Sequence, residues 1–217
     1  MTKPLHCLIT AGPTREYFDP VRYVTNPSSG KMGYALAKAA LNHGWTVDLI
    51  TGPVALLPPD GADVWRVTTA EDMLHAVQSR FAACQLLIMT AAVCDMRPRE
   101  TFTRKVKKDA LKMTVEMEPT PDILRTIAAQ KTSYQRVVGF AAETDDMEIN
   151  ARKKLIEKHL DWIVANKVGG KDSAFESGQN SVYMLGKNNQ HYRIGPAAKT
   201  TVAVEIIEIL AKSEVTD

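Results

Sequence analysis

The chain alternates between short apolar runs and longer segments in which apolar residues recur every three or four positions. Leu5–Ala11, Trp45–Thr51 and Gln85–Val93 are runs rich in β-branched and large aliphatic residues. The third run is almost continuously apolar, which is typical of a strand buried on both faces of a sheet. Because such runs alternate with helical segments, the pattern predicts a mainly parallel sheet with helices on both faces.

Helical spacing of apolar residues predicts five helices between and after these runs. Thr68 and Glu71 have the spacing of a capping box for the second helix, which carries Met73, Leu74 and Val77. Thr120-Pro121-Asp122 is expected to provide the N-cap, the first-turn proline and an acidic first turn for the third helix. The remaining predicted helices cover about 30–43, 147–159 and 197–212.

The remaining strands complete the predicted fold. "DVWRVT", "VVGFAAE" and "DWIVANKV" have strand composition, and "SVYML" and "HYRI" flank the turn "GKNN" as a hairpin would. We therefore expect a single α/β domain over 1–217. Its predicted architecture is a three-layer sandwich, Rossmann-like or ribokinase-like, with a mainly parallel sheet and a C-terminal β-hairpin.

Polar segments follow the predicted strands where ligands bind in such folds. "GPTRE" follows the first strand, "TGPV" the second and "AVCDMRP" the long apolar run. "NPSSGKMG", residues 26–33, leads directly into the first helix. Its Ser28, Ser29 and Gly30 suit either a phosphate-binding helix N-terminus or simple helix capping, and the spacing alone leaves both open.

Composition narrows the class of protein. The 217 residues carry a net charge of +2, which gives no strong reason to expect a nucleic-acid partner. Cys7, Cys84 and Cys94 have neither zinc-ligand nor redox spacing, so buried thiols in a reducing compartment are expected. No apolar run approaches membrane-spanning length, so we expect a cytoplasmic protein without a membrane partner.

Two common nucleotide motifs are missing. A dinucleotide-binding turn needs G-x-G-x-x-G directly after the first strand, but here a long polar loop separates Gly12 from Gly30. The second strand ends in Thr51-Gly52-Pro53, where an acid would be needed to bind ribose hydroxyls. There is also no G-x-x-x-x-G-K-[ST] sequence. A nicotinamide oxidoreductase is therefore a remote third hypothesis, behind the two described below.

Basic residues cluster in two further places. "RKVKKD" contains Arg104, Lys105, Lys107 and Lys108, and Lys154 and Lys158 share one face of their predicted helix. Each cluster alone is most simply a solvated charged surface. Together with the helix start at Gly30, they are also suited to neutralising a triphosphate and a second phosphorylated molecule.

Motifs spread over nearly the whole chain resemble the phosphopantothenoylcysteine synthetase family, the ligases of coenzyme A biosynthesis. The matching segments, in the order of that family, are "AGPTREYFDPVRYVTNPSSGKMG", "AAVCDMRP", "KVKKD", "TPDIL", "VGFAAET", the Lys154/Lys158 helix and "LDWIVAN". The resemblance implies that 4′-phosphopantothenate is joined to L-cysteine. Its carboxylate would attack the α-phosphate of a nucleoside triphosphate, release pyrophosphate and form an acyl-nucleotidylate, which the cysteine amine then attacks.

The resemblance also implies roles for individual residues. Lys105 matches the lysine that contacts the triphosphate, Asn26 the asparagine associated with the acyl intermediate, and Arg22 an arginine implicated in the second half-reaction. Magnesium should accompany the triphosphate. Asp95 could assist there, but it is not assigned as a metal ligand. The nucleotide would lie against Met89, Thr90, Ala91, Asp95, Lys105, Pro121, Asp122, Ile123, Leu124, Phe140, Lys154 and Lys158, with Ser28 in the phosphate cradle.

The family is dimeric, so a homodimer in which the loop carrying Asn26 helps to complete a site across the interface is implied. The compact "NPSSGKMG" and "KVKK" motifs resemble those of bacterial members of the family, many of which use CTP, so the resemblance implies CTP rather than ATP. No flavin is expected because the chain starts at the first strand. Departures from the family at Pro27, Cys94, Met96 and Thr120 affect the base preference more than the reaction class. If they silence the site, the second hypothesis applies: a non-catalytic nucleotide-binding or regulatory module.

Overall fold

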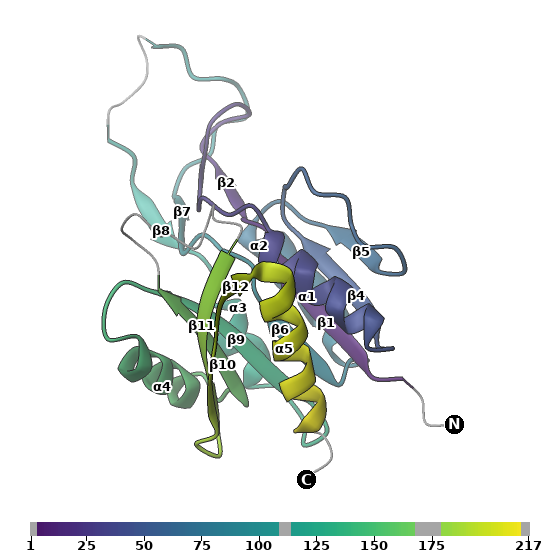
Figure 1. Ribbon diagram of the computed structural model, residues 1–217. Coiled ribbons are helices and arrows are strands. Elements are labelled where there is room, and N and C mark those ends of the chain that lie inside the picture. The colour runs from purple at the N-terminus through teal and green to yellow at the C-terminus, as the bar shows by residue number, and fades with distance from the viewer. Residues whose placement is uncertain (1–3, 109–113, 168–178, 214–217) are drawn as a thin grey trace.

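The computed structural model describes residues 4–108, 114–167 and 179–213, and its centre is an eight-stranded sheet (Figure 1). Asp109 of the "KVKKD" motif and Val168 of the predicted strand "DWIVANKV" lie outside the described residues. The strand order is β12-β11-β10-β9-β6-β1-β4-β5. The strands are β1 (His6–Ala11), β4 (Thr46–Thr51), β5 (Asp63–Arg66), β6 (Leu86–Met89), β9 (Arg136–Glu143), β10 (Trp162–Lys167), β11 (Gln179–Gly186) and β12 (His191–Ala198).

The pairing confirms a mainly parallel sheet with a C-terminal hairpin. All pairs from β5 to β10 are parallel, whereas β11 pairs antiparallel with both β10 and β12. β1 lies near the centre of the sheet, and its residues from Cys7 to Ala11 are buried. Because both faces of this strand are covered, it needs the continuous apolar run seen in the sequence.

Helices cover both faces of the sheet and make the predicted three layers (Figure 1). One face packs against α1 (Lys31–Asn42) and α5 (Lys199–Lys212), which also contact each other. The other face packs against α2 (Ala70–Phe81), α3 (Ile123–Ala128) and α4 (Met147–Glu157). Each fully buried Leu or Ile in these layers contributes about 1.5–3 kcal/mol of transfer free energy. Over the described residues, no helix is long and apolar enough to cross a membrane.

Two predicted helix caps were wrong. The α2 capping box uses Thr69 and Asp72, whose side chain and backbone groups bond reciprocally, rather than Thr68 and Glu71. Thr68 instead donates its backbone N–H to the Asp72 carboxylate. The box lies one residue later because Thr69 has the extended backbone that an N-cap needs, and the shorter Asp at the third helical position serves as well as Glu.

The start of α3 is also later than predicted. Asp122 is the N-cap, and its carboxylate accepts a 3.0 Å hydrogen bond from the backbone N–H of Arg125. Thr120 is not the cap, because its hydroxyl donates to the backbone oxygen of Cys94 at 2.6 Å. That bond ties the approach to α3 to the segment after β6.

The long apolar run predicted as one strand is divided. β6 ends at Met89, because the chain after it leaves the sheet and lines a cavity. The three cysteines are buried as predicted, and burial together with nearby Asp48 raises the pKa of Cys84 to about 12.

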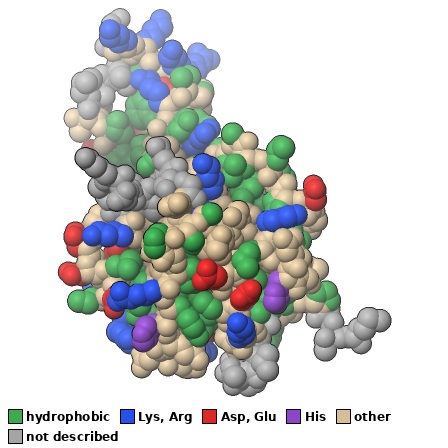
Figure 2. Space-filling view, in the orientation of Figure 1, with side chains coloured by type: hydrophobic (Ala, Val, Ile, Leu, Met, Phe, Trp, Pro, Cys, Tyr) green, Lys and Arg blue, Asp and Glu red, His purple; other side chains and the backbone are tan. Residues whose placement is uncertain are grey.

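Two small antiparallel sheets were not predicted, and they project from the carboxyl-end edge of the main sheet (Figure 1). They consist of very short strands that alternate too briefly to give a pattern. The space-filling view shows Lys and Arg side chains gathered on this projection (Figure 2). The strands are β2 (Arg15–Tyr17) with β3 (Tyr23–Thr25), and β7 (Met96–Pro98) with β8 (Met117–Pro119).

Candidate active site

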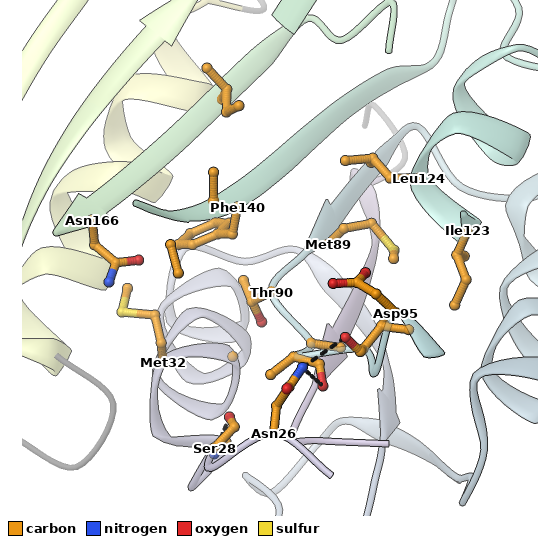
Figure 3. Close-up of a pocket in the computed structure, with 18 of the residues that line it drawn as sticks. Asn26, Ser28, Met32, Met89, Thr90, Asp95, Ile123, Leu124, Phe140 and Asn166 are labelled. Atoms are coloured by element: carbon orange, nitrogen blue, oxygen red, sulfur yellow. Dashed lines mark hydrogen bonds between the residues drawn. The ribbon is translucent and has the colours of Figure 1, made fainter. Parts of the chain in front are cut away.

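A cavity of about 400 Å³ lies at the carboxyl ends of β6, β9 and β10, bounded by the first turn of α1 and by α3 and α4 (Figure 3). From β1 the chain first continues to β4 and β5 on one side, and then to β6, β9 and β10 on the other. The cavity lies near this switch point between β1 and β6, where ligands bind in α/β sheets. Among the sequence-predicted residues, those lining it are Asn26, Ser28, Met89, Thr90, Ala91, Asp95, Pro121, Asp122, Ile123, Leu124, Phe140, Lys154 and Lys158.

The floor of the cavity is fixed by contacts between β1 and the segment after β6. The Thr90 hydroxyl donates to the backbone oxygen of Thr10, and the Thr10 hydroxyl accepts from the backbone N–H of Ala91. α1 packs so closely here that a Cβ on Gly33 would lie 2.5 Å from Thr90 Oγ1 and 2.6 Å from Ala11 Cβ. Glycine at this position therefore brings the first turn of α1 against the cavity floor.

The α1 N-terminus is not capped by a serine. Gly30 is the N-cap, with a φ of 75° that favours glycine, and as a glycine it has no side chain that could cap the first turn. The hydroxyl of Ser28 accepts from the backbone N–H of Gly30 at 3.3 Å instead. The first turn also contains no acidic residue. This geometry favours an anion-binding helix N-terminus over a simple helix cap, because the N-terminus carries partial positive charge.

Three polar side chains at this end of the cavity were missed by the sequence reasoning. Asn166 comes from the carboxyl end of β10, Asn180 from β11 and Lys199 from the first turn of α5. Figure 3 shows Asn166 close to Met32 of α1. The position of Asn166 at the end of the "DWIVAN" strand was a signal that could have identified it. Asn180 lies near the start of β11 and Lys199 directly follows β12, so both belong to an antiparallel hairpin to which the rule on parallel strand ends does not apply.

Lys199 is a buried cation that lines the cavity, with only 7% of its surface exposed. Its pKa is lowered, first by burial and then by the positive charge of Lys31 in the α1 first turn. Two cations that disfavour each other therefore lie at the same end of the cavity as the α1 N-terminus. A bound phosphate would relieve that repulsion.

Asn26 and Asp95 lie between the two ends of the cavity (Figure 3). The side-chain amide of Asn26 donates to the backbone oxygen of Val93 at 2.8 Å, and more weakly to that of Ala92 at 3.5 Å. Because these contacts fix the amide plane, Asn26 presents its remaining polar edge in one orientation. Such preorganised dipoles are suited to stabilising charge that develops during a reaction.

The other end of the cavity combines an apolar wall with two ion pairs. Figure 3 shows Ile123 and Leu124 on this side, from the α3 first turn. Lys154 pairs with Glu143 at 2.6 Å, and Lys158 pairs with Asp122 at 2.9 Å. Both lysines come from α4 or its C-cap.

Asp122 is held as a carboxylate by its neighbours. Burial raises its pKa, but the backbone N–H of Arg125 and the ammonium of Lys158 outweigh burial, and the net pKa is lowered. A nucleotide phosphate at this end would therefore compete with Asp122 for Lys158.

The structure does not bring Arg22 and Lys105 to this cavity within one chain. Neither lines it. Arg22 pairs with Asp19 at the turn between β2 and β3, and Lys105 is exposed in the connection between β7 and β8. Both lie in connections within the two small sheets, and these sheets project from the edge of the main sheet (Figure 1).

Among the described residues, no group of three or more His, Cys, Asp or Glu side chains has the arrangement of a metal site. Asp95 and Asp122 are carboxylates in the cavity lining. That donor set fits a magnesium ion that keeps several waters and is held mainly by substrate phosphates, and it does not fit a resident ion in an all-protein cage.

The sequence and the fold both match known proteins. The family model "DNA/pantothenate metabolism flavoprotein C-terminal domain" matches residues 2–213. A relative from Bacillus subtilis, the coenzyme A biosynthesis bifunctional protein CoaBC, is 47% identical over 207 residues, which are 95% of this chain and 51% of that protein. The chain thus spans about half the length of the curated relatives it matches.

Solved structures agree with these matches. The crystal structure of the C-terminal domain of CoaBC has a TM-score of 0.84 at 40% identity, covering 98% of this chain and 97% of that one. A Cab2 H337A mutant complexed with phosphopantothenate-cysteine has a TM-score of 0.78 at 18% identity, covering 97% of this chain and 86% of that one. The second likeness concerns the fold alone.

Proposed function

We propose that this chain, which belongs to the family of the DNA/pantothenate metabolism flavoprotein C-terminal domain, is a ligase that joins 4′-phosphopantothenate to L-cysteine. The observation that carries this proposal is one cavity with phosphate-binding features at both ends and a fixed asparagine between them. The 40% identity to the C-terminal domain of CoaBC, a protein of coenzyme A biosynthesis by its name, supports the choice of substrates.

The reaction needs an activated acid. A carboxylate is a poor acylating agent, because its leaving group would be oxide. In the proposed reaction it attacks the α-phosphate of a nucleoside triphosphate, with release of pyrophosphate and formation of an acyl-nucleotidylate. The cysteine amine then attacks the acyl carbon, and the nucleoside monophosphate leaves. The first step brings two anions together, so fixed cations are required.

The two ends of the cavity suit the two phosphorylated substrates. The phosphate of the acid would bind at the α1 N-terminus, where Ser28, Lys31 and Lys199 gather. The nucleotide would lie against the end of β6 and the start of α3, near Lys154 and Lys158. This arrangement would place the reacting carboxylate and the α-phosphate near Asn26, between the ends.

The nucleotide is proposed to be CTP, with ATP as the alternative, and to bind with Mg²⁺. The magnesium ion would offset the charge of the triphosphate when bound. Asp95 and Asp122 are the carboxylates available to hold its water shell.

A homodimer would complete the site. Arg22 and Lys105 lie outside the cavity of their own chain, on a projection that carries many exposed apolar side chains. We infer that this projection packs against a second copy of the chain. Arg22 and Lys105 would then reach the cavity of that second copy. The exposed apolar side chains of the projection, named here the projecting patch, are Val21, Tyr23, Val24, Met96, Phe102, Val115 and Met117.

The test is a pyrophosphate assay with the whole chain, 4′-phosphopantothenate, cysteine, Mg²⁺ and each of the four nucleoside triphosphates. Pyrophosphate should appear only when the acid is present, fastest with CTP. Release of orthophosphate and nucleoside diphosphate would indicate an acyl-phosphate route and overturn the assignment.

The alternative function is a non-catalytic nucleotide-binding module. One observation favours it: two of the residues predicted to be catalytic, Arg22 and Lys105, are remote from the cavity in the single chain. Saturable CTP binding without acid-dependent pyrophosphate release, by a chain that remains monomeric, would support this alternative.

A further inference from the structure

One buried carboxylate joins the segments that carry Arg22 and Lys105. Asp19 lies in the turn between β2 and β3 and is only 2% exposed. Its Oδ1 accepts the backbone N–H groups of Val21 and Arg22, both at 2.9 Å. Its Oδ2 accepts from Arg22 Nε at 3.1 Å and from the backbone N–H of Val106 at 3.2 Å. That last N–H belongs to the peptide bond between Lys105 and Val106.

The contact is closed from the other side. Arg22 Nη2 donates to the backbone oxygen of Val106 at 3.1 Å. The Val106 peptide groups are thus held at both the N–H and the carbonyl, by Asp19 and by the arginine that Asp19 orients. Two loops more than 80 residues apart in sequence are joined through one carboxylate and one guanidinium.

A second attachment lies a few residues away. The rings of Phe18 and Phe102 are 5.2 Å apart, and the backbone N–H of Phe102 donates to the oxygen of Phe18 at 3.0 Å. The Arg22 guanidinium also lies 5.3 Å from the centre of the Phe18 ring. Because the loops touch at two places, the connection between β7 and β8 cannot pivot about a single point there.

Holding Lys105 matters because a lysine on a long exposed connection has many conformations. Fixing its backbone in advance removes part of the entropy cost of bringing the ammonium to a phosphate. The Asp19 carboxylate is kept charged in this role: the Arg22 side chain, followed by the backbone N–H groups, holds its pKa well below the usual range despite burial.

We propose that Asp19 is a positioning residue that binds Arg22 and the Lys105–Val106 peptide into one unit, so that Lys105 is held in place for the triphosphate with Arg22 fixed beside it. This inference rests on the proposed ligase function. It adds that Arg22 and Lys105 act as a coupled pair and that Asp19 carries the coupling.

The test uses Asp19→Asn in the whole chain, with kinetics and a structural readout. The asparagine side chain would place its NH2 group against the N–H groups of Arg22 and Val106, which then lose their acceptor. As a result, kcat for acid-dependent pyrophosphate release should fall by about ten- to a hundredfold. In that background, Lys105→Gln should add at most about a twofold loss, because the lysine is already misplaced. Fully additive losses, or an unchanged kcat for Asp19→Asn, would overturn the coupling.

Trypsin cleavage after Lys105 gives an independent measure of the contact. We expect it to be several-fold faster in Asp19→Asn than in the unaltered protein, and equal rates would contradict the inference. The matched control is Asp48→Asn, because Asp48 is another buried carboxylate, paired at 3.2 Å with both Arg80 and His6. It should lower stability without changing this cleavage or kcat.

A second variant covers the case in which Asp19→Asn does not fold. Val106→Pro deletes the amide donor and fixes φ at this residue, and it keeps both partners of the Asp19–Arg22 pair. It should lower kcat and remove most of the effect of Lys105→Gln, whereas unaltered kinetics would overturn the proposal. If the unaltered chain releases no acid-dependent pyrophosphate, the ligase assignment fails, and the trypsin experiment still decides whether Asp19 holds the loop.

Discussion

The side-chain amide of Asn26 donates a 2.8 Å hydrogen bond to the backbone oxygen of Val93. This bond joins the loop before α1 to the segment after β6, and it crosses the middle of the cavity lining (Figure 3). The asparagine is thus oriented by backbone groups that no side-chain substitution elsewhere removes.

Asn26→Asp should therefore reduce ligase activity strongly. A carboxylate has no donor for Val93, so a backbone oxygen loses its partner and faces a negative charge. An unsatisfied buried group costs about 1–3 kcal/mol, which corresponds to roughly five- to a hundredfold in rate if the reacting geometry is lost. The rate of pyrophosphate release and the yield of product per pyrophosphate check this. Asn42→Asp, at the far end of α1, should leave both unchanged; a fully active Asn26→Asp would remove the role assigned to Asn26.

Lys199→Met should weaken binding of 4′-phosphopantothenate while leaving CTP binding unchanged. A hydrogen bond to a charged group is worth about 1.5–3 kcal/mol, so the Kd for the acid should rise by about ten- to a hundredfold. Calorimetry with each ligand separates the two effects. Lys38→Met, on the exposed face of α1, is the control. Equal weakening of CTP would place the phosphate of the acid elsewhere.

The same lysine gives a pH dependence with a definite sign. Because the folded-state pKa of Lys199 is lowered, the unfolded chain binds more protons between that pKa and the ordinary value of 10.5. Stability from this group therefore rises with pH across that window. Below the window, Lys199→Met should raise the melting temperature of the ligand-free protein relative to Lys38→Met. A lower melting temperature would contradict the electrostatic account.

Gly33→Ala should destabilise the fold, although alanine favours helices. The helix propensity gain is about 1 kcal/mol. The added Cβ would lie 2.6 Å from Ala11 Cβ and 3.1 Å from Ala11 Cα, which are part of the central strand and cannot easily move. Overpacking of this kind costs about 1–3 kcal/mol, so the steric cost should prevail. Urea unfolding checks the sign, and the difference between Lys38→Ala and Lys38→Gly measures the glycine-to-alanine propensity gain alone. Stabilisation by Gly33→Ala would show that α1 can move away from the floor.

Val24→Lys should dissociate the proposed homodimer. Val24 lies on β3, whose three residues are all exposed and which pairs only with β2 in the described structure. A lysine in the projecting patch would place a charge in an apolar contact, so sedimentation should show a monomer with little activity. Leu57→Lys, at an apolar side chain that is 90% exposed but outside the patch, is the control. A fully active monomer would contradict the shared site.

Asp161→Asn should cost stability without changing the chemistry. Asp161 is 3% exposed and pairs with Lys131 at 2.7 Å and Lys187 at 3.0 Å, at the opposite edge of the sheet from the cavity. Because the two lysines left behind reach solvent, the loss of these charged hydrogen bonds should cost about 1–3 kcal/mol. Guanidinium unfolding measures this loss, and kcat well below the melting temperature should not change. A loss of kcat there would show that this network communicates with the cavity.

The pH dependence of that loss also has a definite sign. Burial raises the pKa of Asp161. Hydrogen bonds from Lys131, the backbone N–H of Val137 and Lys187 lower it by more, so the net pKa is below 3.8. The contribution to stability is therefore present above pH about 4 and disappears as the pH falls through the folded-state pKa. The difference between the unaltered chain and Asp161→Asn should shrink in acid, and a difference that grows in acid would contradict this assignment.

The sequence alone determined the succession of helices and main-sheet strands along the chain, because buried strands and amphipathic helices impose local periods on apolar residues. The sequence also placed Asp95 at the edge where the parallel strands end, and the resemblance to the ligase family added Met89–Ala91 and Phe140 beside it. Only the tertiary structure decided that Lys199 and Asn180 join them, because their approach depends on how the hairpin and α5 pack against α1. It also decided that Arg22 and Lys105 lie together outside the cavity. Asp19 joins their segments through a contact with Val106 that is distant in sequence, and the local spacing of apolar residues gives no sign of such a contact.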